Sequence, residues 1–219
     1  MLIGACIFDL DGVIVDTAKY HFLAWKRLAD QLGINFTERD NERLKGISRM
    51  ESLEIILGIG KIKANPDLKA KYADLKNNLY LDYISKMTQE EILPGSLEFI
   101  HELRNSGIRV AIGSASKNTP LILERTGIKV LFDAISDGNL VKKAKPDPEV
   151  FIKAADLMGI EPGKCVVFED AIAGVQAAIN AGMFCIGIGL PDVLTNAHFV
   201  ISGLGEMNIE KLNKIIKKL

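Results

Sequence analysis

Short apolar runs alternate with helical segments along most of this chain, and this alternation limits the folds open to it. Residues 2–8 form the first run, and their length and flanking turn residues predict a buried strand. Strands that are separated by helices pair in parallel through right-handed crossovers, so the pattern predicts an α/β fold with a doubly wound, Rossmann-like parallel sheet. The predicted strands are residues 2–8, 108–112, 132–135, 165–168, 184–188 and 198–201.

One interval of about a hundred residues between the first two strands breaks the alternation. Apolar residues recur there at helical spacing, and Asp16 or Thr17 is a candidate cap for a helix over 18–32 that ends at Gly33. We therefore predict a helical cap domain over residues 16–90, inserted into a core domain formed by residues 1–15 and 91–219. The predicted cap helices are 18–32, 38–44, 49–57 and 66–87, and the core helices are 96–105, 119–125, 148–158, 172–180 and 209–218.

The composition is that of a soluble globular protein. The chain has 219 residues, of which 48% are hydrophobic and 25% charged, and its net charge of -1 favours neither nucleic acid nor an anionic membrane as a partner. We expect a small-molecule partner and a monomer. No export signal is visible near Met1, so we expect a cytoplasmic location, with Cys6, Cys165 and Cys185 as buried thiols.

Two carboxylates, Asp9 and Asp11, follow the first apolar run. Ligands of open α/β sheets bind beyond the carboxyl ends of the strands, so chemistry is expected here. Two like charges at one strand end repel each other, and a divalent cation would stabilise them. An aspartate held in this way can attack phosphorus. The alternative is a simple turn, because Asp and Gly12 both favour turns.

Polar residues also follow three later strands. Ser114, Ser116, Lys117 and Asn118 precede a helix, where hydroxyls and free backbone N–H groups would favour an anion, although a capped helix start is the alternative. Lys145 is restricted by Pro146, whereas Lys142 and Lys143 are interpreted as solvated. Glu169 and Asp170 follow another strand and offer hard oxygen ligands for Mg²⁺, or else a charged helix start.

These residues, in this order, resemble the motifs of the haloacid dehalogenase-like superfamily. The matching segments are Asp9-Leu10-Asp11-Gly12, Ser114, Lys145-Pro146 and Glu169-Asp170, and the helical insertion is similar to that of the small-cap subgroup. The resemblance extends to the β-phosphoglucomutases of this superfamily, and it is carried there by the cap segments. Those segments are Asp16-Thr17, the helix with His21 and Trp25, residues 44–49 and residues 114–118.

The resemblance implies a role for each matching core residue. Asp9 would be the nucleophile, and Asp11 would be the general acid and base. Ser114 and Lys145 would neutralise charge on the transferred phosphoryl group. Mg²⁺ would be held by Asp9, the Asp11 carbonyl, Glu169 and Asp170.

In the cap, the resemblance implies residues that bind and close over the substrate. His21 and Lys76 would help to position Asp11, and Arg49 would grip a distal phosphate group. The residues expected to bind substrate are Thr17, Trp25, Lys45, Gly46, Ile47, Arg49, Ser52, Lys76, Ala115, Ser116, Lys117 and Asn118.

The activity that this resemblance implies is conversion of β-D-glucose 1-phosphate to D-glucose 6-phosphate. The reaction would pass through an aspartyl phosphate and a glucose 1,6-bisphosphate intermediate. A Mg²⁺-dependent sugar-phosphate phosphatase is the main alternative, because its core residues would be the same. A non-catalytic binding protein on this fold is a further alternative.

Overall fold

Six parallel strands form one sheet in the computed structural model, which describes residues 3–44 and 47–217. The strand order is β3-β2-β1-β4-β5-β6, so the first strand lies at the centre between β2 and β4. This arrangement confirms the predicted doubly wound sheet. The strands are β1 (Ala5–Phe8), β2 (Arg109–Gly113), β3 (Ala134–Ser136), β4 (Cys165–Glu169), β5 (Phe184–Ile188) and β6 (Phe199–Ile201).

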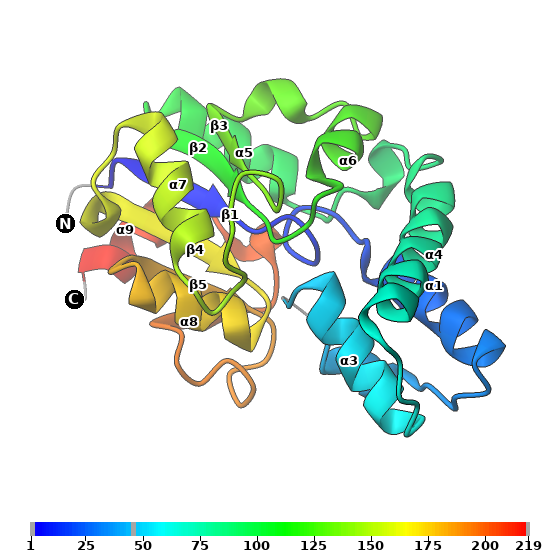
Figure 1. Ribbon diagram of the computed structural model, residues 1–219. Helices are drawn as coiled ribbons and strands as arrows, with labels where there is room; N and C mark the ends of the chain where they lie inside the picture. The colour runs from blue at the N-terminus through cyan, green and yellow to red at the C-terminus, as the bar shows by residue number, and fades with distance from the viewer. Residues whose placement is uncertain (1–2, 45–46, 218–219) are drawn as a thin grey trace.

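Both faces of the sheet are covered by helices (Figure 1). Successive side chains of β1 point to opposite faces: Cys6 and Phe8 belong to one apolar cluster, and Ala5 and Ile7 to the other. Burial on both faces explains why the strands are continuous apolar runs. The helices that follow the cap in sequence are α5 (Ser96–Asn105), α6 (Thr119–Arg125), α7 (Glu149–Met158), α8 (Ile172–Asn180) and α9 (Ile209–Lys217).

Four of the helices between β1 and β2 project to one side of the sheet (Figure 1), whereas α5 packs against the sheet itself. They share an apolar cluster of their own around Trp25, Leu28 and Phe36. The division into domains at residues 16 and 90 stays a prediction, since the last part of the fourth helix packs into the cluster of the sheet through Tyr80 and Ile84. The four helices are α1 (Ala18–Gln31), α2 (Glu38–Glu42), α3 (Arg49–Ile59) and α4 (Pro66–Ile84).

The two connections between the cap helices and the sheet are hydrogen-bonded to each other. The Asp16 N–H donates to the Glu91 carbonyl at 2.8 Å, and the Leu93 N–H donates to the Ile14 carbonyl at 2.9 Å. The two connecting segments therefore lie side by side where the cap helices join the sheet domain.

Some details differ from the sequence-based expectation. Thr17 is the residue before α1, but its side chain does not cap the helix, because its hydroxyl donates to Asp11 instead. Four short 3-10 turns were not predicted: Gln89–Glu91, Lys129–Leu131, Pro162–Lys164 and Leu204–Glu206. The three cysteines are buried free thiols, as predicted. In the described part of the chain, no helix is long and apolar enough to cross a membrane.

Candidate active site

Three charged side chains meet at the carboxyl ends of β1 and β4. The ammonium of Lys145 lies 2.5 Å from Asp9 Oδ1 and 2.8 Å from Glu169 Oε2. All three side chains are buried, and Lys145 and Glu169 are almost completely so. Burial alone would lower the pKa of Lys145, but the charges of Asp9 and Glu169 raise it above its ordinary value. Lys145 therefore stays charged and compensates the carboxylates on two neighbouring strands.

Two glycines make room for the acidic side chains. Gly12 has a φ of 82°, and a Cβ built on it would lie 2.3 Å from Asp170 Oδ2. A Cβ on Gly174 in α8 would lie 2.0 Å from Glu169 Cδ. The carboxylate of Glu169 lies over this helix turn and accepts from the Ala171 N–H at 3.0 Å. The loop after β1 and the first turn of α8 are thus shaped around the carboxylates.

Carboxylate oxygens of Asp9, Glu169 and Asp170 all lie within 4.8 Å of one another, so one cation could contact all three. Hard oxygen ligands of this kind suit Mg²⁺ or Ca²⁺. Burial raises the pKa of Glu169 to about 7, with Lys145 opposing and Asp9 adding to the shift. The site is therefore electrostatically suited to a divalent cation. The participation of the Asp11 carbonyl stays a prediction.

Asp11 lies two residues beyond Asp9 and contacts the cap rather than Lys145. The Thr17 hydroxyl donates to Asp11 Oδ1, and His21 Nε2 lies 3.9 Å from the same oxygen. Burial and the charge of Asp9 raise the pKa of Asp11 to about 6, against the hydrogen bond from Thr17. A carboxyl group that gains and loses its proton near neutral pH suits general acid and base catalysis.

On the cap side, His21 and Lys76 form a second group of titratable side chains. Lys76 Nζ lies 2.9 Å from His21 Nδ1 and also lies over the rings of Trp25 and Tyr80, 4.7 and 4.6 Å from their centroids. Burial lowers the pKa of Lys76 to about 7, and the nearby charge of Arg49 contributes to the shift. Burial and the charge of Lys76 also hold the pKa of His21 well below its ordinary value. His21 is therefore neutral, and its Nδ1 accepts from the Lys76 ammonium.

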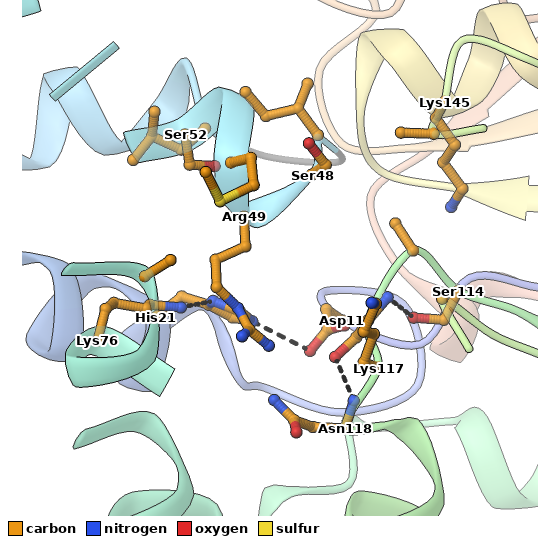
Figure 2. A pocket seen from close by; sticks show the side chains of 18 of the residues that line it. Asp11, His21, Ser48, Arg49, Ser52, Lys76, Ser114, Lys117, Asn118 and Lys145 are labelled. Carbon is orange, nitrogen blue, oxygen red and sulfur yellow. Dashed lines mark hydrogen bonds and ion pairs between the residues drawn. The ribbon is translucent and has the colours of Figure 1, made fainter. Parts of the chain in front are cut away.

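The core and cap groups face each other across a cavity of about 510 Å³ (Figure 2). Arg49 extends from the start of α3 toward His21 and Asp11, and Lys145 and Ser114 lie on the opposite wall. Arg49 is half-buried, and burial lowers its pKa. Predicted site residues that line this cavity are Asp9, Asp11, His21, Trp25, Ile47, Arg49, Ser52, Lys76, Ser114, Ala115, Ser116, Lys117, Asn118, Lys145 and Asp170.

The loop after β2 was expected to offer free N–H groups to an anion, and the structure corrects this in part. The Ser116 N–H donates to Ser114 Oγ at 3.1 Å, and the Asn118 N–H donates to Ser116 Oγ at 3.2 Å (Figure 2). These two amides are therefore already hydrogen-bonded within the turn and are not free for an anion. The Asn118 side-chain amide donates to Asn77 Oδ1 of α4 at 3.1 Å.

Two predicted residues among those described do not line the cavity. Thr17 and Glu169 are fully buried behind the cavity wall, where they contact Asp11 and Lys145. Lys45 and Gly46 lie outside the described residues, so their predicted contact with substrate stays a prediction.

Sequence reasoning missed other residues of the cavity. Asn41 and Asp74 line it from the cap, and Tyr80 packs its ring 4.1 Å from that of His21. Lys142 and Lys143 are exposed, as predicted, and they also line the cavity. Their position beside Lys145 was the one signal that could have indicated this.

Comparison with known proteins agrees with this geometry. The sequence profile of haloacid dehalogenase-like hydrolases matches residues 3–182. The chain is 44% identical over 212 residues to a β-phosphoglucomutase of Bacillus subtilis, covering 96% of this chain and 94% of that protein. It is 31% identical to a phosphorylated carbohydrates phosphatase of Thermotoga maritima, over 82% of each chain.

Solved structures give the same result. The crystal structure of a β-phosphoglucomutase from Clostridium difficile superimposes with a TM-score of 0.94 at 39% identity, covering 99% of this chain and 98% of that one. The likeness extends over both the sheet and the cap helices. The chain therefore belongs to the haloacid dehalogenase-like hydrolase family and, within that family, is similar to the β-phosphoglucomutases.

Proposed function

We propose that the protein converts β-D-glucose 1-phosphate to D-glucose 6-phosphate through an aspartyl phosphate and glucose 1,6-bisphosphate. The observation that carries this proposal is the distribution of charge in the cavity. A buried nucleophilic carboxylate, Asp9, lies at one wall, and the cations Arg49 and Lys76 lie at the other. Among the described residues, neither cation forms an ion pair with a carboxylate. A sugar with phosphate groups at both ends would place one of them for reaction at Asp9 and the other beside the cations of the cap wall.

Asp9 is the proposed nucleophile. Its Oδ1 contacts Lys145, which orients the carboxylate and leaves the other oxygen available to attack phosphorus. Phosphoryl transfer needs charge neutralisation on the equatorial oxygens, and Lys145 and Ser114 lie on the wall where those oxygens would be. Asp11 would then take the proton from the accepting sugar hydroxyl and return it to the leaving one.

The three carboxylates around Asp9 fit a Mg²⁺ ion by ligand type and spacing, and we infer that Asp9, Glu169 and Asp170 hold it. Bound there, the ion would supply charge neutralisation to the phosphoryl group in the transition state. Lys145 also holds two of these carboxylates in place. Its two ion pairs orient Asp9 and Glu169 before any ligand binds.

The cap supplies the second phosphate contact. The guanidinium of Arg49 can bind a phosphate group in bidentate fashion, and its partly buried position strengthens that contact. Neutral His21 accepts from Lys76, and its other ring nitrogen faces Asp11. Closure of the cap over the sugar would exclude water, so that a hydroxyl group rather than water receives the phosphoryl group.

A sugar-phosphate phosphatase is the second candidate, and the similarity to the Thermotoga phosphatase supports it. Phosphorus NMR separates the two functions in one experiment. With Mg²⁺, β-glucose 1-phosphate and a trace of the 1,6-bisphosphate, we expect the glucose 6-phosphate signal to grow. Inorganic phosphate as the main product would overturn the mutase proposal.

A further inference from the structure

Three exposed lysines, Lys117, Lys142 and Lys143, lie along the core side of the cavity, on the loops that follow β2 and β3. The two loops are locked together. A Cβ built on Gly138 would lie 2.5 Å from the Ala115 carbonyl oxygen, and Asn139 Nδ2 donates to the Lys117 carbonyl at 2.9 Å. The three lysines therefore line the same cavity from two loops that contact each other.

The backbone of the loop that follows β3 is held in place at Lys142 and Lys143, which have no role in the proposed mechanism. The N–H groups of Lys142 and Lys143 both donate to Glu149 Oε2, at 3.0 and 2.8 Å. The side chains of Lys142 and Lys143 thus start from a rigid position at the cavity edge, although their ammonium groups are in water. The Glu149 carboxylate that orders this loop is bound to its backbone, and within the described chain it forms no ion pair with either ammonium group.

Lys142 and Lys143 differ in whether a carboxylate group compensates their charge. Lys143 Nζ lies 3.4 Å from Asp147, which reduces its effect on an anion. Lys142 forms no ion pair within the described chain, so its charge is fully available at the cavity. An exposed charge at the edge of a binding site changes the association rate and its salt dependence more than it changes the contacts of the bound state.

We propose that Lys142 and Lys143 form a phosphate-capture edge that selects doubly phosphorylated sugars. This inference rests on the proposed sugar-phosphate substrate. Each phosphate group carries about -1.5 to -2 charges at pH 7, so the bisphosphate is attracted about twice as strongly as a monophosphate. While one phosphate group is bound near Asp9, the charge of the edge attracts the other from the core side of the cavity. A bisphosphate that leaves Asp9 is then recaptured rather than lost.

The test compares the double variant Lys142→Ser/Lys143→Ser with the matched double variant Lys153→Ser/Lys214→Ser. The control removes the same net charge from exposed lysines that do not line the cavity. The readout is kcat/KM for the bisphosphate and for the monophosphate, at about 0.01 M and about 1 M salt, where the screening length is about 30 and about 3 Å. Consumption of substrate is followed, so that isomerisation and hydrolysis are both counted.

At low salt we expect the capture-edge variant to lose about tenfold in kcat/KM for the bisphosphate and about threefold for the monophosphate, with kcat within about twofold. The loss should disappear at high salt, and Lys142→Ser alone should account for most of it. Equal loss in the control, a loss independent of salt or a loss in kcat would overturn the proposal. If inorganic phosphate is the product, the proposed function is wrong, but the salt comparison still tests the edge.

Discussion

Each of the two walls of the cavity contains a buried lysine, but the two lysines have different partners. On the sheet side, Lys145 is fully buried between Asp9 and Glu169, and its pKa is raised. On the cap side, Lys76 is equally buried but lies against a neutral histidine and two aromatic rings, and burial lowers its pKa to about 7. On the sheet side, carboxylates of the protein itself compensate the buried lysine. The cap side has a positive charge that an anionic ligand would compensate.

Among substitutions that test this difference between the walls, we expect the largest effect on activity from a change of the proposed nucleophile, Asp9. Asp9→Asn removes the attacking carboxylate and half of the charge that compensates Lys145. We expect kcat to fall by at least about 10³, as is usual for a covalent nucleophile. Steady-state assays with a phosphate-release control measure this. A variant that keeps a tenth of the wild-type rate would contradict the role of Asp9.

Lys145→Met tests whether the sheet side depends on its cation. It leaves two buried carboxylates uncompensated, and removal of one partner from a buried ion pair costs about 3–5 kcal/mol. Denaturant unfolding in EDTA, which keeps added cations from replacing Lys145, measures the free energy of unfolding. Lys143→Met, at an exposed lysine on the same loop, is the matched control and should change stability by less than about 0.5 kcal/mol. An unchanged midpoint for Lys145→Met would mean that the ion pairs do not stabilise the sheet side.

Arg49→Ala tests whether the cap wall binds the distal phosphate group. We expect KM for the sugar phosphate to rise by about tenfold or more, because a charged hydrogen bond contributes about 1.5–3 kcal/mol. Stability should change little, since Arg49 is only half-buried. Initial rates over a range of substrate concentrations separate KM from kcat. An unchanged KM would argue against the assignment.

Lys76→Met should have the smallest effect of the four substitutions. It should raise the free energy of unfolding, whereas Lys145→Met should lower it. The substitution removes a buried charge without a carboxylate partner, so we expect the free energy of unfolding to rise by about 1 kcal/mol and Tm by about 2–4 °C, while activity falls. The folded pKa is about 7 and lies below that of the unfolded chain. The gain should therefore be complete below pH 7 and should decrease as pH rises toward the ordinary lysine pKa. Thermal melts at pH 6 and pH 9 measure this, and a loss of stability at pH 6 would contradict the comparison.

Most of the framework could be predicted because it depends on local patterns. The predicted bounds of α5, α6, α8 and β5 agree with the structure, since each segment lies between turn residues and has one dominant periodicity. The carboxyl-end rule also located Asp9 and Asp170 on the cavity, because parallel strands bring their ends to one edge.

The rest of the site depended on contacts between distant segments. Thr17 has the properties of a helix cap, yet its hydroxyl donates to Asp11, which is a tertiary contact that outweighs the local preference. Asp74 lies on the cavity because α4 passes over it, and nothing in the surrounding sequence indicates this. Lys142 and Lys143 are exposed lysines in every local respect, and only the position of their loop places them at the cavity.

Gly174 shows how easily this site could be lost without any change in its charged groups. Its missing side chain is the space that Glu169 occupies, since a methyl group there would overlap the carboxylate. Gly174→Ala favours a helix by propensity alone, yet it would displace the carboxylate that anchors Lys145. A mutation of this kind escapes any search for altered catalytic residues. Genomic surveys that judge whether such chains are active should therefore examine this glycine together with the acidic residues it accommodates.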